Sequence, residues 1–587
     1  MKSISRTLAL VLALALSLFA DDKKIAPDAG KSGTVIVQFK NDPDSALQAR
    51  LSLSGARLKQ YLGNLKAGLY EVPTGRPVLN AISSEAQVHY ITSDRPVAAS
   101  LDHAVSSIYA DFKSSGYATG KGITVAVIDS GVNATADLTT GVSRVIYRED
   151  FTGGNNPNDQ FGHGTHVASM LGGDGSLSEG NKFFRTFRGV APEVRIVSLK
   201  VLDAKGMGTE SAVVRAIDRA ISLSRILNIR VINLSLGRPV LESYKTDPLC
   251  QAVERAWKAG IVVVVAAGNE GRNNLAKTKG YGMIMSPGND PYVITVGAMK
   301  DMANNGSRTD DQIASYSSKG PSAADHVIKP DLVAPGNMII ADAVPGSLLW
   351  NTAPASAKVK RNVYEYTTST AFTSDYIRLS GTSMSAALVS GAAALMLDRD
   401  DDLSPDTIKA RLMKTAYKTF PRRSKTVVNG KTYWSYYDIF TVGAGYLDVQ
   451  AALRNRDVVR RTQSAQSPVA AWNKKTKKAV MLVMSQNIIW GGDEEAWGTN
   501  IIWGGDEVSG ENIIWGGDEV TAFNIIWGGD EEAVWGESGV AGNNIIWGSN
   551  IIWGGDDNSW GGESVRTTNI IWGGLVDEDV TTVGDPQ

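Results

Sequence analysis

A serine, a histidine and an aspartate stand in three stretches whose sequences constrain the backbone around them. Ser383 follows Gly381 and Thr382 and precedes an apolar run of small residues that ends at Met396. This run predicts a helix with Ser383 at its N-terminus, where unpaired N–H groups and the helix dipole favour developing negative charge. Because a serine hydroxyl is a weak nucleophile alone, it needs a base within hydrogen-bond reach.

The base, and a carboxylate to support it, stand upstream of the serine. His163 lies between two glycines, and Asp129 ends the apolar run 125–128. A histidine can take the proton of a serine hydroxyl, and a carboxylate behind the histidine fixes its tautomer. Each residue alone has a structural explanation, because an aspartate after a strand often forms a turn and a serine often caps a helix. The three together predict nucleophilic catalysis by a serine.

At these motifs the chain resembles the subtilisin-type serine proteases, the subtilases. The order Asp, His, Ser is that of subtilisin, and the segment 266–271 resembles the oxyanion-hole loop of the family. The resemblance implies a serine endopeptidase in which Ser383 attacks the carbonyl, His163 carries the proton and Asp129 orients the histidine. It assigns the oxyanion hole to the Asn269 amide and the Ser383 backbone N–H. It also implies protein or peptide substrates and no cofactor for the chemistry.

The resemblance also locates the pocket for the substrate side chain before the scissile bond. One wall belongs to a strand that pairs with the substrate backbone, and the other wall faces it. The wall residues are Ser235, Leu236 and Gly237 on the first side and Ala266, Ala267 and Gly268 on the second. Because these residues are small or apolar, an open pocket for a large uncharged side chain is expected.

The chain departs from the family pattern at one position and leaves a second feature open. Subtilases usually carry a proline four residues after the nucleophile, where this chain has Ala387. Proline near the start of the helix fixes the backbone beside the nucleophile, so its loss predicts weaker hydrolysis. Asp137 resembles the start of the family's calcium site, but the loop 172–187 does not match clearly. A structural calcium ion is therefore left open, and no metal ligands are assigned.

Alternating strand and helix patterns predict the scaffold that holds these residues. Apolar, β-branched runs without polar alternation are typical of strands buried on both faces. They lie at 123–128, 194–201, 231–236, 261–267 and 293–296. Helical patterns at 210–227 and 249–259 separate some of them. The alternation predicts an α/β fold with a subtilisin-like, doubly wound and mostly parallel sheet, and it places the catalytic groups at strand ends or in the loops beyond.

The 587 residues divide into five predicted parts. Residues 1–20 have the charged start and short apolar core of a signal peptide, which predicts a secreted protein. Residues 21–105 contain no catalytic motif and resemble the small α+β propeptide of the family, an intramolecular inhibitor that the zymogen removes by self-processing. An ordinary accessory domain is the alternative. The peptidase domain covers 106–456, a linker covers 457–486, and a repeat tail of short strands covers 487–587.

The tail differs in composition from the rest of the chain. It contains 19 acidic residues and one basic residue, Arg566, for a net charge of −18, so the remainder of the chain carries +16. The pentapeptide Asn-Ile-Ile-Trp-Gly occurs seven times in it, together with ten of the 14 tryptophans. Ile-Ile-Trp favours strands and Gly-Gly-Asp favours turns, which predicts short stacked strands or hairpins. Calcium binding, contact with glycans or a cell surface, and a cleavable extension without a fold are the alternatives.

Composition excludes some other functions. Without a basic cluster interleaved with aromatic residues, nucleic-acid binding is not expected. Cys250 is the only cysteine, so an intrachain disulfide and a cysteine metal cluster are excluded, and a buried apolar role is expected. His166 is expected to pack behind His163, because no third metal ligand is suggested near the pair. The rival function is a surface interaction protein that binds through its tail and uses the protease domain as a scaffold.

Overall fold

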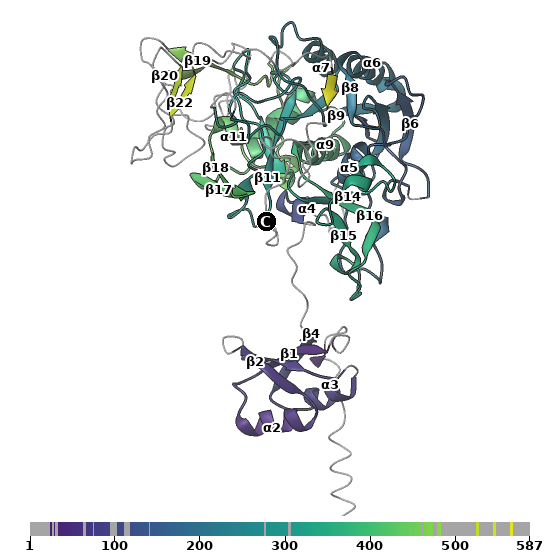
Figure 1. Cartoon of the computed structure of the whole chain (residues 1–587), viewed down its shortest axis with the longest axis vertical. Coiled ribbons are helices and arrows are strands. Elements are labelled where there is room, and N and C mark those ends of the chain that lie inside the picture. The colour runs from purple at the N-terminus through teal and green to yellow at the C-terminus, as the bar shows by residue number, and fades with distance from the viewer. Residues whose placement is uncertain are drawn as a thin grey trace, which may run out of the picture. The chain divides into compact units, whose positions relative to one another are not determined.

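The computed structural model describes most of the chain between residues 24 and 482 and three short strands beyond it. The described residues are 24–25, 29, 33–62, 66–73, 76–93, 103–110, 118–139, 141–274, 278–302, 307–460, 463–473, 478–482, 524–527, 544–547 and 564–566. The chain divides into two units, residues 1–98 and 99–587 (Figure 1). None of the described helices is long and apolar enough to cross a membrane. The predicted signal peptide lies outside the described residues.

The first unit is an antiparallel sheet of four strands with two helices. In the spatial order β2-β3-β1-β4 the strands are β2 (Arg57–Leu62), β3 (Ala67–Glu71), β1 (Thr34–Phe39) and β4 (Val88–Ser93), and the helices are α2 (Ser45–Leu53) and α3 (Arg76–Ser83). Partly exposed and buried residues alternate along β1. Val35, Val37 and Phe39 therefore point into the core, which Leu47 of α2 and Leu79 of α3 complete.

The second unit is built on an eight-stranded sheet. Along the sheet the order is β12-β11-β10-β9-β5-β7-β6, and β13 also pairs with β11. The strands are β5 (Thr124–Asp129), β6 (Val145–Asp150), β7 (Arg195–Lys200), β9 (Ile229–Leu234), β10 (Val262–Ala266), β11 (Ile294–Lys300), β12 (Gln312–Ile313) and β13 (Leu332–Pro335). Every pairing within this sheet is parallel except that of β11 with β12. The prediction of a mostly parallel α/β sheet is confirmed.

Two pairs of helices cover this sheet. Helix α5 (His163–Gly172) packs against α9 (Thr382–Arg399), and α6 (Glu210–Leu227) packs against α7 (Pro248–Lys258). All residues of β5 and β10 are buried. Strands covered on both faces have no solvent side, which is why their sequences show apolar runs without polar alternation.

Helix α9 crosses the centre of the second unit. It contacts β9, β10, β11 and β13, and 16 of its 18 residues are buried. Small residues allow this close packing, because a Cβ added to Gly391 would lie 2.6 Å from the Cβ of Val190. The helix therefore presents its N-terminal residues, Thr382 and Ser383, at one edge of the sheet.

Capping residues in the sequence set the ends of the other helices. Thr209 accepts the Ala212 N–H at the start of α6, and Asn228 ends that helix in the left-handed conformation. Ser404 caps α10 (Pro405–Thr415), which has proline in its first turn. The remaining elements of this part of the chain are η3 (Ala136–Leu138), η4 (Ser176–Ser178), β14 (Ile339–Asp342), α8 (Leu348–Thr352), β15 (Lys358–Lys360), η5 (Arg361–Val363), β16 (Phe372–Leu379), β17 (Arg423–Val428), β18 (Lys431–Tyr436), α11 (Ile439–Val442) and α12 (Val449–Arg454).

The boundary predicted between propeptide and peptidase differs from the boundary in the structure. The two units divide between residues 98 and 99. Helix α4 (His103–Ser107) follows this division, and its Ala104 belongs to the hydrophobic core of the second unit. The predicted division at 105/106 therefore falls inside a helix of the second unit.

The segment predicted as a linker, 457–486, contains a hairpin. Strands β19 (Val469–Asn473) and β20 (Lys478–Leu482) pair antiparallel. Just before them, the Pro468 carbonyl accepts the Ile328 N–H at 2.8 Å. Backbone hydrogen bonds anchor this polar segment to the second unit, and such bonds leave little trace in composition.

Three short strands of the tail are described. Strands β21 (Asn524–Trp527) and β22 (Asn544–Trp547) pair in parallel, and each residue lies beside the same residue type of the other repeat. Strand β23 (Ser564–Arg566) pairs antiparallel with β8 (Met207–Thr209), which follows β7 in the sequence. In Figure 1 it is the yellow arrow beside β8. The pairing of β21 with β22 involves two of the seven repeats, so the predicted repeat tail of short strands stays a prediction. The pairing of the tail with β8 has no counterpart in the predictions.

Candidate active site

The aspartate and the histidine are joined where β5 ends. Asp129 is the last residue of β5, and His163 is the first residue of α5. Nδ1 of His163 lies 2.7 Å from Oδ1 and 2.9 Å from Oδ2 of Asp129, and both side chains are fully buried. Since only a protonated Nδ1 can donate to the carboxylate, this contact sets the tautomer of the ring. Gly164 allows the start of α5 to lie close to the segment after β5, because a Cβ at position 164 would lie 2.2 Å from the Gly131 carbonyl oxygen.

The serine stands at the start of α9, as its sequence predicts. Ser383 is the second residue of that helix. Its hydroxyl donates to the Ser235 carbonyl at 3.2 Å, and its carbonyl accepts from the Ser235 hydroxyl at 3.0 Å. Nε2 of His163 is buried and has no hydrogen-bond partner among the described residues. In this structure the serine hydroxyl is thus held by the segment after β9 and not by the histidine.

Asn269 is fixed by the first residue of α9. Its side-chain oxygen accepts the Thr382 N–H at 3.0 Å and the Thr382 hydroxyl at 3.2 Å. The Thr382 hydroxyl in turn accepts the Gly268 N–H at 3.1 Å. These contacts turn the amide oxygen toward α9 and its NH2 group to the opposite side. Thr382 is not among the predicted site residues, although it stands between the glycine and the serine of the motif.

Comparison with known proteins identifies the family in which residues such as Asp129, His163, Ser383 and Asn269 occur together. The Subtilase family model matches residues 120–437, more than half of the chain. The chain belongs to the subtilase family. It is 34% identical over 403 residues to serine protease AprX of Bacillus subtilis (strain 168), an alignment that covers 67% of this chain and 80% of that protein. It is 30% identical over 467 residues to subtilisin E of the same strain, covering 77% of this chain and 100% of that protein.

These relatives establish what kind of enzyme the chain is. As a subtilase, it is a serine endopeptidase whose substrates are proteins. A solved structure described as MycP1 with the N-terminal propeptide removed is 28% identical, covers 60% of this chain and 97% of its own, and has a TM-score of 0.41. The rival function of a binding scaffold finds no support in the named relatives.

The two predicted walls of the subtilase pocket follow neighbouring strands. Residues 235–237 come directly after β9, and residues 266–268 end and follow β10. Because β9 and β10 pair in parallel, both walls lie at the same edge of the sheet. Residues 235–237 lie beyond the bounds of β9, so the wall predicted as part of a strand is an extension of that strand's path.

Met285 lies between these walls. A Cβ added to Gly237 would lie 3.1 Å from the Met285 Cβ, and one added to Gly268 would lie 2.8 Å from its Cγ. The Met285 N–H donates to the Ala267 carbonyl at 3.1 Å, and its side chain is buried. The thioether therefore occupies space that the small wall residues would leave open. Met285 stands outside every family motif that the sequence shows, so no local signal pointed to it.

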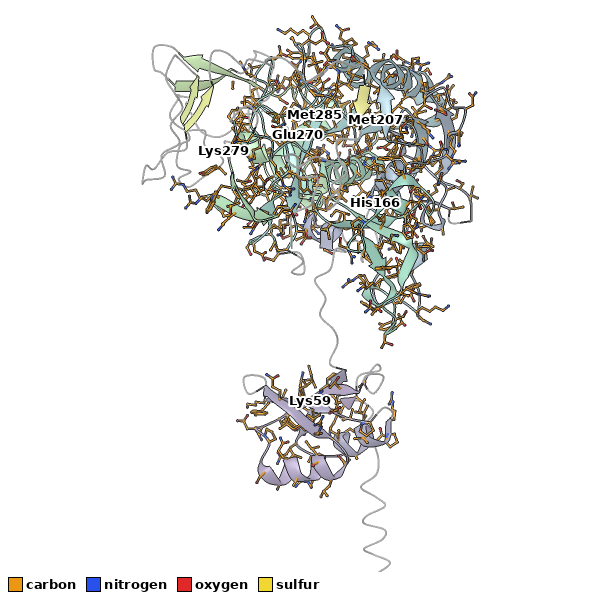
Figure 2. The ribbon with its side chains drawn as sticks, in the orientation of Figure 1. Lys59, His166, Met207, Glu270, Lys279 and Met285 are labelled. Atoms are coloured by element: carbon orange, nitrogen blue, oxygen red, sulfur yellow. The ribbon has the colours of Figure 1, made fainter. Side chains whose placement is uncertain are left out.

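His166 lies one turn after His163 on the same helix (Figure 2). Its Nε2 lies 3.2 Å from the Ile339 carbonyl oxygen. Complete burial, with a smaller contribution from His163, lowers the pKa of His166 to about 3. It is therefore a neutral side chain packed in the core. Within the described residues, the cluster with three potential metal ligands is the exposed run of aspartates at 400–402, which does not include this pair.

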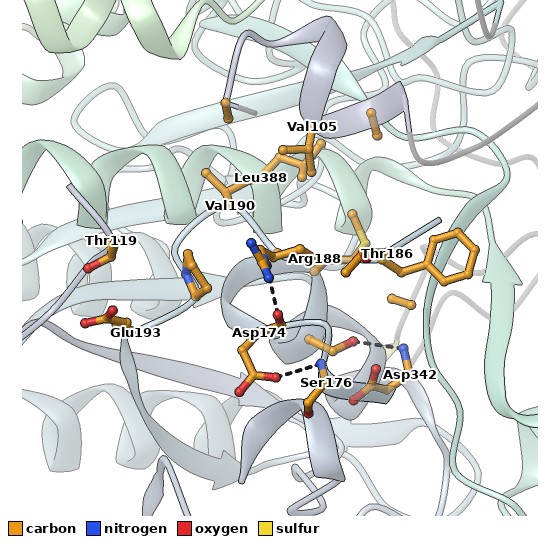
Figure 3. A pocket seen from close by; sticks show the side chains of 18 of the residues that line it. Val105, Thr119, Asp174, Ser176, Thr186, Arg188, Val190, Glu193, Asp342 and Leu388 are labelled. Carbon is orange, nitrogen blue, oxygen red and sulfur yellow. Dashed lines mark hydrogen bonds between the residues drawn. The ribbon is translucent and has the colours of Figure 1, made fainter. Parts of the chain in front are cut away.

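The surroundings of Asp137 test whether a calcium ion fits there. The carboxylate accepts the Leu177 N–H at 2.6 Å and the Tyr376 hydroxyl at 3.1 Å. Burial raises the pKa of Asp137, and burial together with Asp137 raises the pKa of Asp342 well above its usual range. A cavity of about 1230 Å³ adjoins this region and is lined by Asp174 and Asp342 (Figure 3). The triad residues do not line this cavity.

Arg144 supplies a fixed positive charge beside Asp137. Its guanidinium donates to the backbone carbonyls of Asp137, Gly172 and Val194 and lies 3.7 Å from the Asp174 carboxylate. A calcium ion needs six to eight oxygen ligands. Here Arg144 already binds three of the nearby carbonyl oxygens. The structural calcium ion therefore stays a prediction, and no ligands are assigned to it.

Proposed function

We propose that the chain is a secreted serine endopeptidase, made as a zymogen, that cleaves peptide bonds through an acyl-enzyme on Ser383. The observation that carries the proposal is the hydrogen bond between Asp129 and Nδ1 of His163. With its proton on Nδ1, the neutral ring presents the lone pair of Nε2 as a proton acceptor. A buried Nε2 without a described partner is in the state that a general base requires before it meets a hydroxyl.

The reaction begins when the Ser383 hydroxyl exchanges the Ser235 carbonyl for Nε2 of His163 as its acceptor. His163 takes the proton as Oγ bonds to the substrate carbonyl carbon, and Asp129 stabilises the imidazolium that forms. The C–N bond then breaks, and His163 gives the proton to the leaving amine. A water molecule attacks the resulting ester through the same base, which releases the acid product and restores the serine.

The substrate oxygen becomes negative in each tetrahedral intermediate, and two donors are prepared for it. One is the amide NH2 of Asn269, which Thr382 orients by binding the amide oxygen. The other is the backbone N–H of Ser383 in the first turn of α9, where helix N–H groups have no intrahelical partner. In subtilisin, a preorganised side-chain donor of this kind contributes about 2.7–4 kcal/mol to transition-state stabilisation.

The substrate class follows from Met285 between the pocket walls. Its side chain shortens the pocket, so we infer a small uncharged side chain before the scissile bond in place of the large one expected from the walls alone. Pocket volume discriminates moderately, since one methylene in an apolar pocket changes transition-state binding by about 1–3 kcal/mol.

Export and self-processing complete the proposal. Residues 1–20 direct secretion, and the first unit acts as an intramolecular inhibitor until it is removed. The first unit supports this role because it has its own core and none of the catalytic motifs. We expect the cut between Ser93, which ends β4, and His103, which begins α4 in the core of the second unit.

Mass spectrometry of the purified full chain beside its Ser383→Ala variant tests this function. The active chain should lose residues up to a point between 93 and 103 and should hydrolyse casein, whereas Ser383→Ala should remain whole and inactive. Ser385→Ala is the matched control, because that hydroxyl is on the same helix but donates to the Ala334 and Pro335 carbonyls. Equal processing of Ser383→Ala and the unaltered chain would rule out Ser383 as the nucleophile.

A further inference from the structure

One edge of strand β8 has backbone groups that can pair with another strand. The Met207 N–H donates to Asp203 Oδ1 at 3.0 Å, and the Met207 carbonyl accepts the Asp203 N–H at 2.7 Å, so both groups point into the turn before the strand. Backbone groups of successive strand residues point in opposite directions. The N–H and carbonyl of Gly208 therefore point the other way, toward β23.

The tail fills this edge. Strand β23 runs antiparallel to β8 with the pairs Ser564–Thr209, Val565–Gly208 and Arg566–Met207. Since the polar groups of Gly208 face the tail, Val565 and Gly208 form the pair that exchanges both hydrogen bonds. Glycine is needed at 208 because a Cβ there would lie 2.2 Å from the Val201 carbonyl oxygen. Strand β8 thus packs closely against Val201 on one side, and on the other side its backbone groups can pair with another strand.

The direction of β23 leads toward the catalytic histidine. The chain leaves β23 after Arg566, at the end that pairs with Met207. The preceding residue on that edge, Gly206, lies against Phe161, since a Cβ there would meet the ring at 2.6 Å. The Phe161 ring centroid lies 6.5 Å from that of His163. The residues that follow Arg566 in the sequence are two threonines and then the last repeat, which begins at 569.

Charge also favours contact between the tail and the rest of the chain. The tail carries a net charge of −18 and the rest of the chain +16, which favours contact between them at low salt. The strand pairing specifies where the contact is made.

The geometry points to an internal inhibitory ligand: segment 564–566 of the tail adds to the β8 edge as an antiparallel strand near His163 and obstructs peptide binding at the active site until it is displaced. The inference rests on the proposed function, because the site that the segment obstructs is the one proposed for catalysis. A segment that belongs to the same chain needs little intrinsic affinity, because tethering can raise its effective concentration to about millimolar.

Hydrogen exchange on the inactive full chain tests the contact separately from catalysis. Val565→Pro removes the N–H that pairs with Gly208, and Val534→Pro is the matched control, the same change in the tail outside the paired strand. In the Ser383→Ala background, we expect the Gly208 amide to exchange about tenfold faster with Val565→Pro than without it, because pairing protects an edge amide. Equal exchange in the two proteins would overturn the inference.

Kinetics with a short peptide substrate then test competition. In the active chain, Val565→Pro should lower KM by about tenfold with little change in kcat, as release of a tethered competitor requires, while Val534→Pro should leave both unchanged. An unchanged KM in a protein that hydrolyses the peptide would overturn the inference and leave the proposed function standing. Faster exchange at Gly208 in a chain that hydrolyses no peptide would support the contact and overturn the proposed function.

Discussion

Helices α5 and α9 each carry one residue of the proposed catalytic triad and, one turn later, one residue that packs in the core. His163 and Ser383 are the first pair, and His166 and Ala387 are the second. All four are fully buried, so burial does not distinguish them. Their partners do. His163 meets the Asp129 carboxylate and keeps a second nitrogen without a described partner, whereas His166 contacts a backbone carbonyl.

The difference shows what converts a buried imidazole into a base. Burial alone disfavours the charged ring, and the pKa of His166 falls to about 3 as a result. A carboxylate beside the ring offsets that cost, because it stabilises the imidazolium when a proton arrives. The same residue type on one helix can therefore be inert or catalytic according to a single neighbour.

Replacing the two histidines should give the largest contrast. His163→Ala should lower kcat about 10⁶-fold, the loss that follows removal of the histidine in subtilisin. His166→Gln keeps an N–H donor for the Ile339 carbonyl and should retain most activity. Hydrolysis of a chromogenic peptide by both folded variants measures this, and equal losses would erase the distinction between the two positions.

Asn269→Ala should produce the next largest effect. The variant removes a donor that acts on the transition state, so kcat should fall about 10²- to 10³-fold while KM changes little. Asn273→Ala is a control in the same loop, since that amide donates to Glu270. A rise in KM with unchanged kcat would instead place Asn269 in ground-state binding.

The buried position of His166 should make the stability of the chain depend on pH. Burial lowers the folded-state pKa of His166 from 6.5 to about 3. Below pH 6.5 His166 binds a proton in the unfolded chain but not in the folded chain. The stability that is present above pH 6.5 is therefore lost as the pH falls toward 3. The slope reaches about 1.4 kcal/mol per pH unit. His166→Gln in the Ser383→Ala background should flatten this slope in urea unfolding between pH 4 and 7, and an unaltered slope would contradict it.

Met285→Ala should change which substrate side chain the predicted specificity pocket accepts. Shortening the side chain opens space between the pocket walls, so kcat/KM for a peptide with phenylalanine before the scissile bond should rise about ten- to a hundredfold relative to one with alanine. A panel of peptides that differ at this one position gives the ratio. An unchanged ratio would place Met285 outside the specificity pocket.

Ala387→Pro should have the smallest effect. Proline removes the N–H that would bond to the Ser383 carbonyl, but that carbonyl still accepts the Ser235 hydroxyl at 3.0 Å. Restoring the family's residue should raise kcat by about twofold at most, because it adjusts the backbone beside the nucleophile without altering a reacting group. Identical turnover would show that the departure from the family pattern is neutral.

Much of the fold and the triad could be predicted because their signals are local. Helix α6 spans the predicted 210–227 because Thr209 and Asn228 mark its ends, and the buried strands show unbroken apolar runs. Asp129, His163 and Ser383 stand in motifs with constrained backbones. The signals for these elements lie within a few residues of each other.

The rest depends on contacts between distant segments. Met285 lies between the predicted pocket walls and comes from a loop without a motif, and Arg144 reaches carbonyls on three separate stretches. The pairing of β23 with β8 joins the end of the chain to its middle through backbone groups, which carry no residue pattern. The polar segment at 463–473 was likewise indistinguishable from a linker by composition.

The in-register pairing of β21 with β22 has a consequence for how the tail can change over generations. Each residue lies beside its own type, so the two units are interchangeable. The two paired units begin 20 residues apart, and in the sequence the starts of successive units are between 6 and 20 residues apart. Duplication or deletion of a unit during replication would therefore alter the number of repeats while each new neighbour still finds an identical edge.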